Sequence, residues 1–505
     1  MRETPPRTRA SGPVQGRLRR IARTLSAEPA PLAILTRQSW HPWLVVGLVC
    51  LGAMIGQLDA TIVQLALPTL GRTFAASLET VSWVALAYLV AFASCLPVFG
   101  RLCDMFGRKQ LYLAGYLLFV LASLACGLAP DLPWLIGFRV LQGIGGALLG
   151  ANSIAILVKA IDPGRRGRAL GIFAAAQAIG MSAGPAVGGV VLETLGWQWV
   201  FWVSVPFGLA AGAVGWLVLP QTEHSDRAAT FDGRGALLIG PALILLVIAL
   251  NHVASWGATS PLTLALTASS ALLLWLLVRQ ERAVPFPLVD LALFRSRGFA
   301  CGAVAVVLGY AMLYGMFFLM AFALEHGHGD SPRAAGLRLA IIPVALGLVA
   351  PFSGTLSARL GVRRLGVAGM VACLCAVLLL ALAQAEPDAS RWIGATAFAL
   401  FGAGLGVFIA PNNHATIEAA PARLAGEAGA LLNLMRVLGS SLGVASASST
   451  LAWRLQAATG RQGDWIDFPG HPLLGAVESS LVVLALMAAA AAMVSLLRGT
   501  GRPQP

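Results

Sequence analysis

The stretch WLVVGLVCLGAMIGQLDATIVQLAL, residues 43–67, is apolar almost throughout and contains one carboxylate, Asp59. A helix needs about 20 apolar residues to cross a bilayer, so this stretch predicts a transmembrane helix. A charge at membrane depth costs at least about 2.5 kcal/mol, and such charges face the protein interior or a water-filled cavity. Asp59 is therefore the first candidate functional residue.

The composition extends this prediction to the whole chain. Of its 505 residues, 57% are hydrophobic and 11% are charged, whereas a soluble domain carries about 25% charged residues. The formal net charge of +13 does not indicate a nucleic-acid partner, because the basic residues concentrate in the N-terminal tail and in short loops. The seven cysteines lie mostly inside apolar runs, where they behave as small hydrophobic residues, and we expect no metal site.

Fourteen apolar runs follow one another along the sequence in groups of six, two and six. We therefore expect an all-α membrane protein with fourteen transmembrane helices. Two six-helix bundles, 43–219 and 298–497, are joined by a linker, 220–297, that contains the two extra helices. A basic tail, 1–42, precedes the first bundle, and a short tail, 498–505, follows the second.

The basic residues are unevenly distributed between the two sides that this count defines. Loops on the side of the termini carry seventeen Lys and Arg residues, and loops on the other side carry six. Basic loops favour the cytoplasmic side of a membrane. We expect a multi-pass protein of the inner (cytoplasmic) membrane, surrounded by the lipid bilayer, with both termini in the cytoplasm.

The two predicted bundles contain related sequences. Residues 100–111 follow the second run, and residues 354–365 follow the second run of the last six. Both segments have Gly, Leu, Gly, a basic residue and Leu at the same spacing. Two parallel six-helix repeats are typical of transporters whose halves rock around a site near the bilayer midplane.

Arg139, in the fourth run, is the predicted partner of Asp59. At 1.5 Å per residue, Asp59 lies about 24 Å from the cytoplasmic start of its helix, and Arg139 lies about one turn inside the outer end of its own. At this shared depth each charge lowers the desolvation cost of the other. The pair either locks two helices together or forms a proton site, in which burial favours the neutral acid and Arg139 favours the carboxylate.

Other polar and small residues are candidates for the cavity and its gating. Arg436, with Asn433 on the same helix face, either lines the site or packs with its charge turned to the membrane surface. The fifth run has five helix-breaking residues within ten positions, which permit close helix contact and a bend. The candidates are Gln142, Gly143, Gly180, Gly184, Pro185, Gly188, Gly189, Asn433 and Arg436.

Together these stretches resemble the major facilitator superfamily, within it the fourteen-helix drug:proton antiporters of EmrB/QacA type. Residues 59–68 are similar to the first-helix pattern of that branch, residues 139–146 to its proton-relay signature and residues 180–189 to its antiporter signature. The resemblance implies proton coupling through Asp59 and Arg139, with the proton gradient as driving force and no cofactor. It also implies a cytoplasmic latch, formed by Gly100, Arg101, Asp104, Gly107, Arg108 and Lys109, that holds the outward-facing state.

The sequence departs from the pattern of that branch at Gln64, Gln198 and Ser204. Within the last six runs it also has no carboxylate, which lowers the expectation of dicationic substrates. We expect a proton-coupled exporter of small amphipathic compounds. The alternatives are a dedicated exporter of one metabolite (an amino acid, siderophore or lipid precursor), an importer, or a membrane enzyme or sensor. No catalytic motif supports the enzyme, and the need for a periplasmic adaptor is left undecided. His326, His328 and Asp330 are interpreted as outer-loop residues.

Overall fold

Fourteen helices in the described part of the chain are long and apolar enough to cross a membrane, which confirms the predicted number. The computed structural model describes residues 30–221, 231–284, 287–385, 390–421, 424–459, 465–467 and 470–498. No strand occurs among these residues, so the predicted all-α class is confirmed as well.

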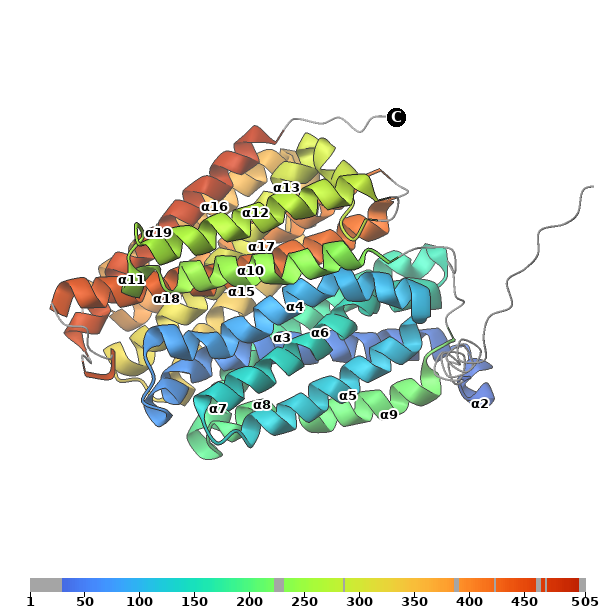
Figure 1. Ribbon diagram of the computed structural model, residues 1–505, viewed down its shortest axis with the longest axis horizontal. Helices are drawn as coiled ribbons and strands as arrows, with labels where there is room; N and C mark the ends of the chain where they lie inside the picture. The colour runs from blue at the N-terminus through green and yellow to red at the C-terminus, as the bar shows by residue number, and fades with distance from the viewer. Residues whose placement is uncertain are drawn as a thin grey trace, which may run out of the picture.

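The first six spans form one bundle, the lower blue-to-green part of Figure 1. Several helices start with a side-chain cap: Ser77 accepts a hydrogen bond from the backbone N–H of Thr80, and Asp131 accepts one from that of Trp134. The helices are α3 (His41–Thr73), α4 (Leu78–Phe106), α5 (Arg108–Gly127), α6 (Leu132–Ala160), α7 (Arg166–Thr194) and the broken pair α8 (Gln198–Trp202) and α9 (Val205–Val218).

The last six spans form the second bundle. Its first helix continues into a π-helical turn, η3 (Ala323–Gly327), and its second is broken into α14 and α15. The helices are α13 (Arg297–Phe322), α14 (Pro332–Leu339), α15 (Ile341–Leu360), α16 (Val362–Ala385), α17 (Ser390–Glu418), α18 (Ala425–Thr459) and α19 (His471–Leu497).

The sequence repeat has a structural counterpart. In the first bundle α3 packs on α7 and α4 packs on α6, and in the second α13 packs on α18 and α15 packs on α17. A tight turn joins the second and third spans of each bundle. Its single residue is Gly107 in the first bundle and Gly361 in the second, with φ angles of 102° and 81°. Glycine adopts such positive angles without steric cost, which explains why it recurs in the repeat.

The bundles meet along three contacts: α3 with α13, α4 with α18, and α7 with α14 and α15. We call the side that holds His41 and Leu497 the terminal side, and the side that holds the end of α3 at Thr73 the distal side. A cavity between the bundles is lined mainly by α3, α4 and α6 from one half and by α13 and α18 from the other.

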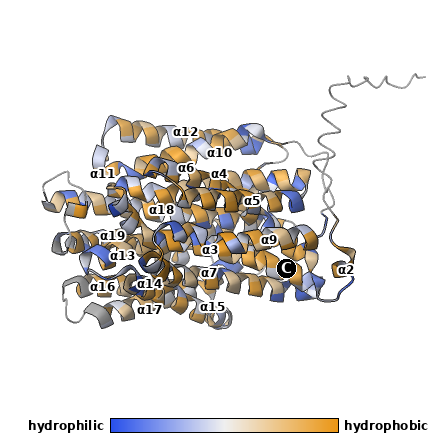
Figure 2. Cartoon of the chain, turned by 90° about the horizontal axis from the view of Figure 1, so that it is seen from below, coloured by the Kyte–Doolittle hydropathy of each residue, from blue (hydrophilic) through white to orange (hydrophobic). Residues whose placement is uncertain are grey.

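The two extra helices, α10 (Gly233–Asn251) and α12 (Pro261–Ala283), form a hairpin with the short α11 (Val253–Trp256) between them. α10 packs against both α4 and α18, while α12 contacts mainly α10 and lies at the edge of the protein (Figure 2). The Asn251 side chain fixes the hairpin by accepting a hydrogen bond from Ser82 and donating one to the carbonyl of Glu79.

In both predicted tails, the residues that the structure describes contact the bundles. A short helix, α2 (Ala33–Thr36), precedes α3, and Leu32 donates a backbone hydrogen bond to Leu217. Arg498, assigned to the C-terminal tail, is buried and donates to the side chains of Asn412 and Thr416. The remaining tail residues, 1–29 and 499–505, lie outside the described residues.

Candidate functional site

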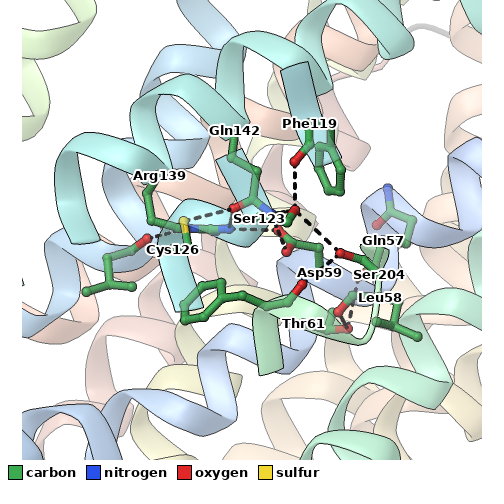
Figure 3. Close-up of polar contacts among 12 residues, drawn as sticks. Gln57, Leu58, Asp59, Thr61, Phe119, Ser123, Cys126, Arg139, Gln142 and Ser204 are labelled. Atoms are coloured by element: carbon green, nitrogen blue, oxygen red, sulfur yellow. Dashed lines mark hydrogen bonds and ion pairs between the residues drawn. The ribbon is translucent and has the colours of Figure 1, made fainter. Parts of the chain in front are cut away.

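Asp59 and Arg139 form a fully buried ion pair between α3 and α6. Arg139 Nη1 lies 2.8 Å from Asp59 Oδ2, and each residue is 1% exposed. The other carboxylate oxygen, Oδ1, accepts a hydrogen bond of 2.8 Å from Gln142 Nε2, and Gln142 Oε1 accepts one from Arg139. The predicted contact is therefore present, and Gln142, one turn after Arg139 on α6, completes a closed triangle (Figure 3).

Two further helices hold this triangle in place. Arg139 Nε donates to the carbonyl of Val84 on α4, and the guanidinium lies 4.4 Å from the ring centre of Tyr88. Gln142 also donates to Ser123 of α5, whose hydroxyl lies 3.5 Å from that of Ser204. The charge thus sits in a network of four helices with both carboxylate oxygens satisfied, which offsets its desolvation.

A central cavity of about 230 Å³ lies between the bundles, beside the ion pair. Ala60, the residue after Asp59, lines it, and so does Tyr88, whose ring contacts Arg139. Of the predicted cavity residues, Asn433 and Arg436 line it from the opposite half. The buried pair is therefore separated from the cavity by one layer of side chains, with Tyr88 in contact with both.

A second cavity, of about 490 Å³, adjoins the first on the terminal side. The two share Gly150, Ile154, Gly429 and Asn433 as lining residues. Four predicted latch residues also line the second cavity: Gly100, Arg101, Asp104 and Arg108. The space between the bundles therefore extends toward the terminal side.

Three of the latch residues make contacts within the first bundle in this state. Asp104 and Arg108 pair with each other, one helical turn apart on the first bundle. Lys109 is buried, and its Nζ donates to the carbonyl of Leu219 at the end of α9, also in the first bundle. The latch was predicted for the opposite, outward-facing state, and for that state it stays a prediction.

The predicted glycines on α7 act in this structure as close-packing positions. A Cβ atom at Gly180 would collide with the Met54 carbonyl, and one at Gly184 would collide with the Thr61 hydroxyl, so α7 fits α3 only without side chains there. Gly188 faces Ile62, also on α3. Gly143 permits close packing of α6 on α4, because a Cβ atom there would collide with the Tyr88 carbonyl.

Two residues of the α7 stretch contact the other bundle. A Cβ atom at Gly189 would meet the carbonyl of Pro332, and the carbonyl of Pro185 lies against Gly336 of α14. Pro185 stands within an unbroken α7. Glu193, further along α7, accepts hydrogen bonds from the Ser331 hydroxyl and the Arg333 backbone. α7 therefore helps to close the distal side between the bundles.

Trp465 is the largest side chain in this distal closure. It lies in the short turn η5 (Trp465–Asp467), is 1% exposed and occupies the space beside Gly71 of α3. Its Nε1 donates to the carbonyl of Ala76, and its ring makes an edge contact with Phe322 at 4.9 Å. A residue of the second bundle thus fills a hollow in the first. The structure is closed on the distal side and hollow toward the terminal side.

Glu325 requires a correction to the sequence analysis, which placed no carboxylate in the last six spans. The apolar run ends at Leu324, but η3 continues the helix by one π-turn, and Glu325 is buried within the ninth span. Its Oε2 lies 3.4 Å from Arg72 and 3.3 Å from the Thr69 hydroxyl, both on α3. Glu325 belongs to the distal closure, so the described lining of the central cavity still lacks a carboxylate.

The structure shows the surroundings of His326 and Asp330. No group of three His, Cys, Asp or Glu side chains in the described chain is arranged to hold a metal ion. His326 instead packs against Trp465, at 4.5 Å between ring centres, and Asp330 pairs with Arg338 at 2.8 Å. This cluster therefore contributes to the distal closure.

Comparison with known proteins connects this architecture with a family. A family model described as the Major Facilitator Superfamily matches residues 49–444. The chain belongs to the major facilitator superfamily. The predicted membership is thus confirmed, and with it the expectation that this is a transporter and not an enzyme.

Two relatives of this major facilitator differ in what their names say they carry. The tetracenomycin C resistance and export protein of Streptomyces glaucescens is 34% identical over 415 residues, covering 82% of this chain and 77% of the relative. The riboflavin transporter RibZ of Clostridioides difficile is 30% identical over 413 residues, covering 82% and 89%. Among solved structures, a bacterial homologue of the human lysosomal transporter Spinster has a TM-score of 0.64 at 16% identity, covering 91% and 97%, and shows the shared fold.

Four residues of this facilitator's site were missed by the sequence analysis. Tyr88 and Ser123 complete the ion-pair network, and Glu325 and Trp465 complete the distal closure. A signal existed for Glu325, an acid directly after an apolar run. Tyr88 and Ser123 are ordinary residues of apolar helices, and only the rotation of α4 and α5 about their axes directs them to Arg139 and Gln142.

Proposed function

We propose that this transporter exports small amphipathic compounds in exchange for protons, by alternating access across a bacterial cytoplasmic membrane. The observation that carries the proposal is the buried Asp59–Arg139–Gln142 triangle one side-chain layer from the central cavity. Asp59 is the group expected to take up and release the proton. The relative named as a resistance and export protein supports the direction of transport.

The contacts of Arg139 link the protonation of Asp59 to the wall of the cavity. While Asp59 is ionised, its two oxygens accept hydrogen bonds from Arg139 and Gln142. A proton on Asp59 removes the counter-ion of Arg139, which stays charged because arginine retains its proton. The guanidinium then shifts toward its other partners, and Tyr88, which contacts it, forms part of the cavity wall. Protonation of Asp59 and the shape of the cavity are linked in this way.

Coupling requires that the proton and the substrate favour opposite orientations of the two bundles. A proton crossing a potential of 100 mV releases about 2.3 kcal/mol. At about 1.4 kcal/mol per decade, one proton sustains roughly 40-fold accumulation of a neutral solute. The state described here has its cavity toward the terminal side, and the basic loops favour the cytoplasm for that side. In the opposite state, Asp104 with Arg101 and Arg108 would latch the cytoplasmic side.

A second candidate is a dedicated exporter of one natural metabolite. The relative named as a riboflavin transporter, 30% identical to this chain, favours it. The same proton site serves both candidates, because coupling is separate from the choice of substrate. A transport panel distinguishes them: a dedicated exporter moves one natural compound, and a drug exporter moves several unrelated ones.

Proton-driven accumulation in inside-out membrane vesicles tests the proposal. The probes are three fluorescent coumarins, one anionic, one neutral and one cationic. A proton gradient is imposed, with the acidic side inside the vesicles. The variant Asp59→Asn and the double variant Asp59→Asn/Arg139→Gln are each expected to lose at least about 90% of gradient-driven accumulation, while still binding the transported coumarin. Asp162→Asn, an exposed acid beside η1 (Pro163–Arg165), is the matched control and is expected to match the unmodified protein. Full accumulation in the double variant would refute proton coupling through Asp59.

A further inference from the structure

The central cavity carries a positive charge that no group among the described residues neutralises. Of the described residues that line it, Arg436 on α18 is the one charged side chain. Within the described chain its guanidinium makes no ion pair and no hydrogen bond, and its nearest aromatic neighbour is the Tyr310 ring, 5.9 Å from its centre. By contrast, the buried Arg139 donates hydrogen bonds to Asp59, Gln142 and Val84 and is neutralised by Asp59.

An arginine at this depth needs a compensating charge or water. Asp59 cannot provide the charge, because Arg139 already neutralises it. Glu325 cannot provide it either, because it is buried in the distal closure beside Arg72. A bound anion would complete the site, and Asn433, one turn before Arg436, lines the same cavity with an amide group that can donate a hydrogen bond.

The rest of the lining favours flat, apolar molecules. Tyr88, Phe92, Phe173, Tyr310 and Tyr314 surround the cavity from α4, α7 and α13. Aromatic side chains stack on planar rings. Their ring faces also attract cations, and the Arg436 guanidinium already lies 5.9 Å from the centre of the Tyr310 ring. With Arg436 already present, a cationic ligand would meet like-charge repulsion.

We propose that the cavity binds planar aromatic compounds that carry one acidic group, with the anion at Arg436 and the ring among the tyrosines. This inference rests on the proposed export function for its biological meaning, but it concerns binding alone. It defines the substrate class by charge: aromatic monoanions are preferred over the neutral form, and the neutral form over cations.

Binding to the purified protein in detergent tests the inference without requiring transport. The probes are 7-methoxycoumarin-3-carboxylate, its methyl ester and an analogue with a trimethylammonium group in place of the carboxylate, each followed by fluorescence anisotropy. The acid is expected to bind at least about tenfold more tightly than the ester, as a hydrogen bond to a charged partner provides. The cation is expected to bind most weakly.

Substitutions at Arg436 assign this preference to one residue. Arg436→Gln is expected to weaken binding of the acid about tenfold and binding of the ester less than about threefold. Arg436→Glu is expected to reverse the order of acid and cation. Arg454→Gln is the control, because that arginine is on the same helix but stacks on Trp453 outside the cavity lining. Binding of the ester shows that each variant is folded.

Two results would overturn the inference: equal or tighter binding of the cation by the unmodified protein, or an unchanged preference for the acid in Arg436→Gln. These outcomes are separate from failure of the export proposal. If the acid binds as expected but Asp59→Asn still accumulates it in vesicles, the coupling is wrong and the binding class stands. If coupling holds for the neutral ester alone, the binding class is wrong and the export function stands.

Discussion

Replacing Asp59 by Asn is expected to lower the free energy of unfolding by about 3–5 kcal/mol, because it leaves a buried guanidinium without its counter-ion. Arg139 is 1% exposed and cannot release its proton. Its contacts with Val84, Gln142 and Tyr88 remain, so the loss is expected near the lower end of that range. Thermal unfolding of the purified protein in detergent measures the effect.

The partner substitution, Arg139→Gln, is expected to lower the free energy of unfolding by less, and the size of this loss is expected to depend on pH. It leaves Asp59 buried, but an acid can become neutral by taking up a proton. The folded variant then holds a proton that the unfolded chain releases, so the stability of this variant rises as the pH falls. The double variant Asp59→Asn/Arg139→Gln removes both charges and is expected to recover most of the stability. Equal losses in both single variants, without recovery in the double variant, would contradict a paired charge.

Replacing Trp465 by Ala is expected to open the distal side. The side chain is fully buried between the bundles, and removing such an aromatic group costs about 3–5 kcal/mol in the state that contains it. Because about 1.4 kcal/mol corresponds to a tenfold change in population, the balance between the two states shifts more than about 100-fold toward distal opening. Distances between spin labels at Thr73 and Ala457, both exposed near the distal ends of α3 and α18, measure this shift.

Two control variants separate this effect from general damage. Trp453→Ala removes a tryptophan that is 50% exposed on α18 and is expected to leave the label distances unchanged. Arg72→Gln removes the ion pair with the buried Glu325, but Glu325 keeps its hydrogen bond from Thr69, and the Arg72 side chain is 47% exposed, so the expected effect is smaller than that of Trp465→Ala. If Arg72→Gln opened the distal side more than Trp465→Ala, the closure would be electrostatic and not a matter of packing.

The sequence predicted those features that depend on position along a helix. The depth of Asp59 and Arg139 follows from the rise per residue, so their contact could be expected from the sequence alone. Gln142 lies one turn from Arg139 and shares its helix face. The spacing of Gly180 and Gly184 likewise predicted close packing on the α7 face.

Features that depend on the rotation of a helix or the path of a loop could not be predicted. Ser123 reaches Gln142 because of how α5 is turned, and its apolar surroundings give no signal. Glu325 was placed outside the membrane because hydropathy ends at Leu324, while the backbone continues through a π-turn. Trp465 lies in a turn whose position depends on contacts with the other bundle, far away in sequence.

The most direct test of the central claim is proton movement driven by substrate alone. Proteoliposomes with a pH dye inside and no ion gradient receive the transported coumarin from outside. As the compound enters in exchange for protons, the internal pH is expected to rise, and the double variant Asp59→Asn/Arg139→Gln is expected to give no change. Uptake by the unmodified protein without a pH change, or an unaltered pH rise in the double variant, would contradict a proton site at Asp59.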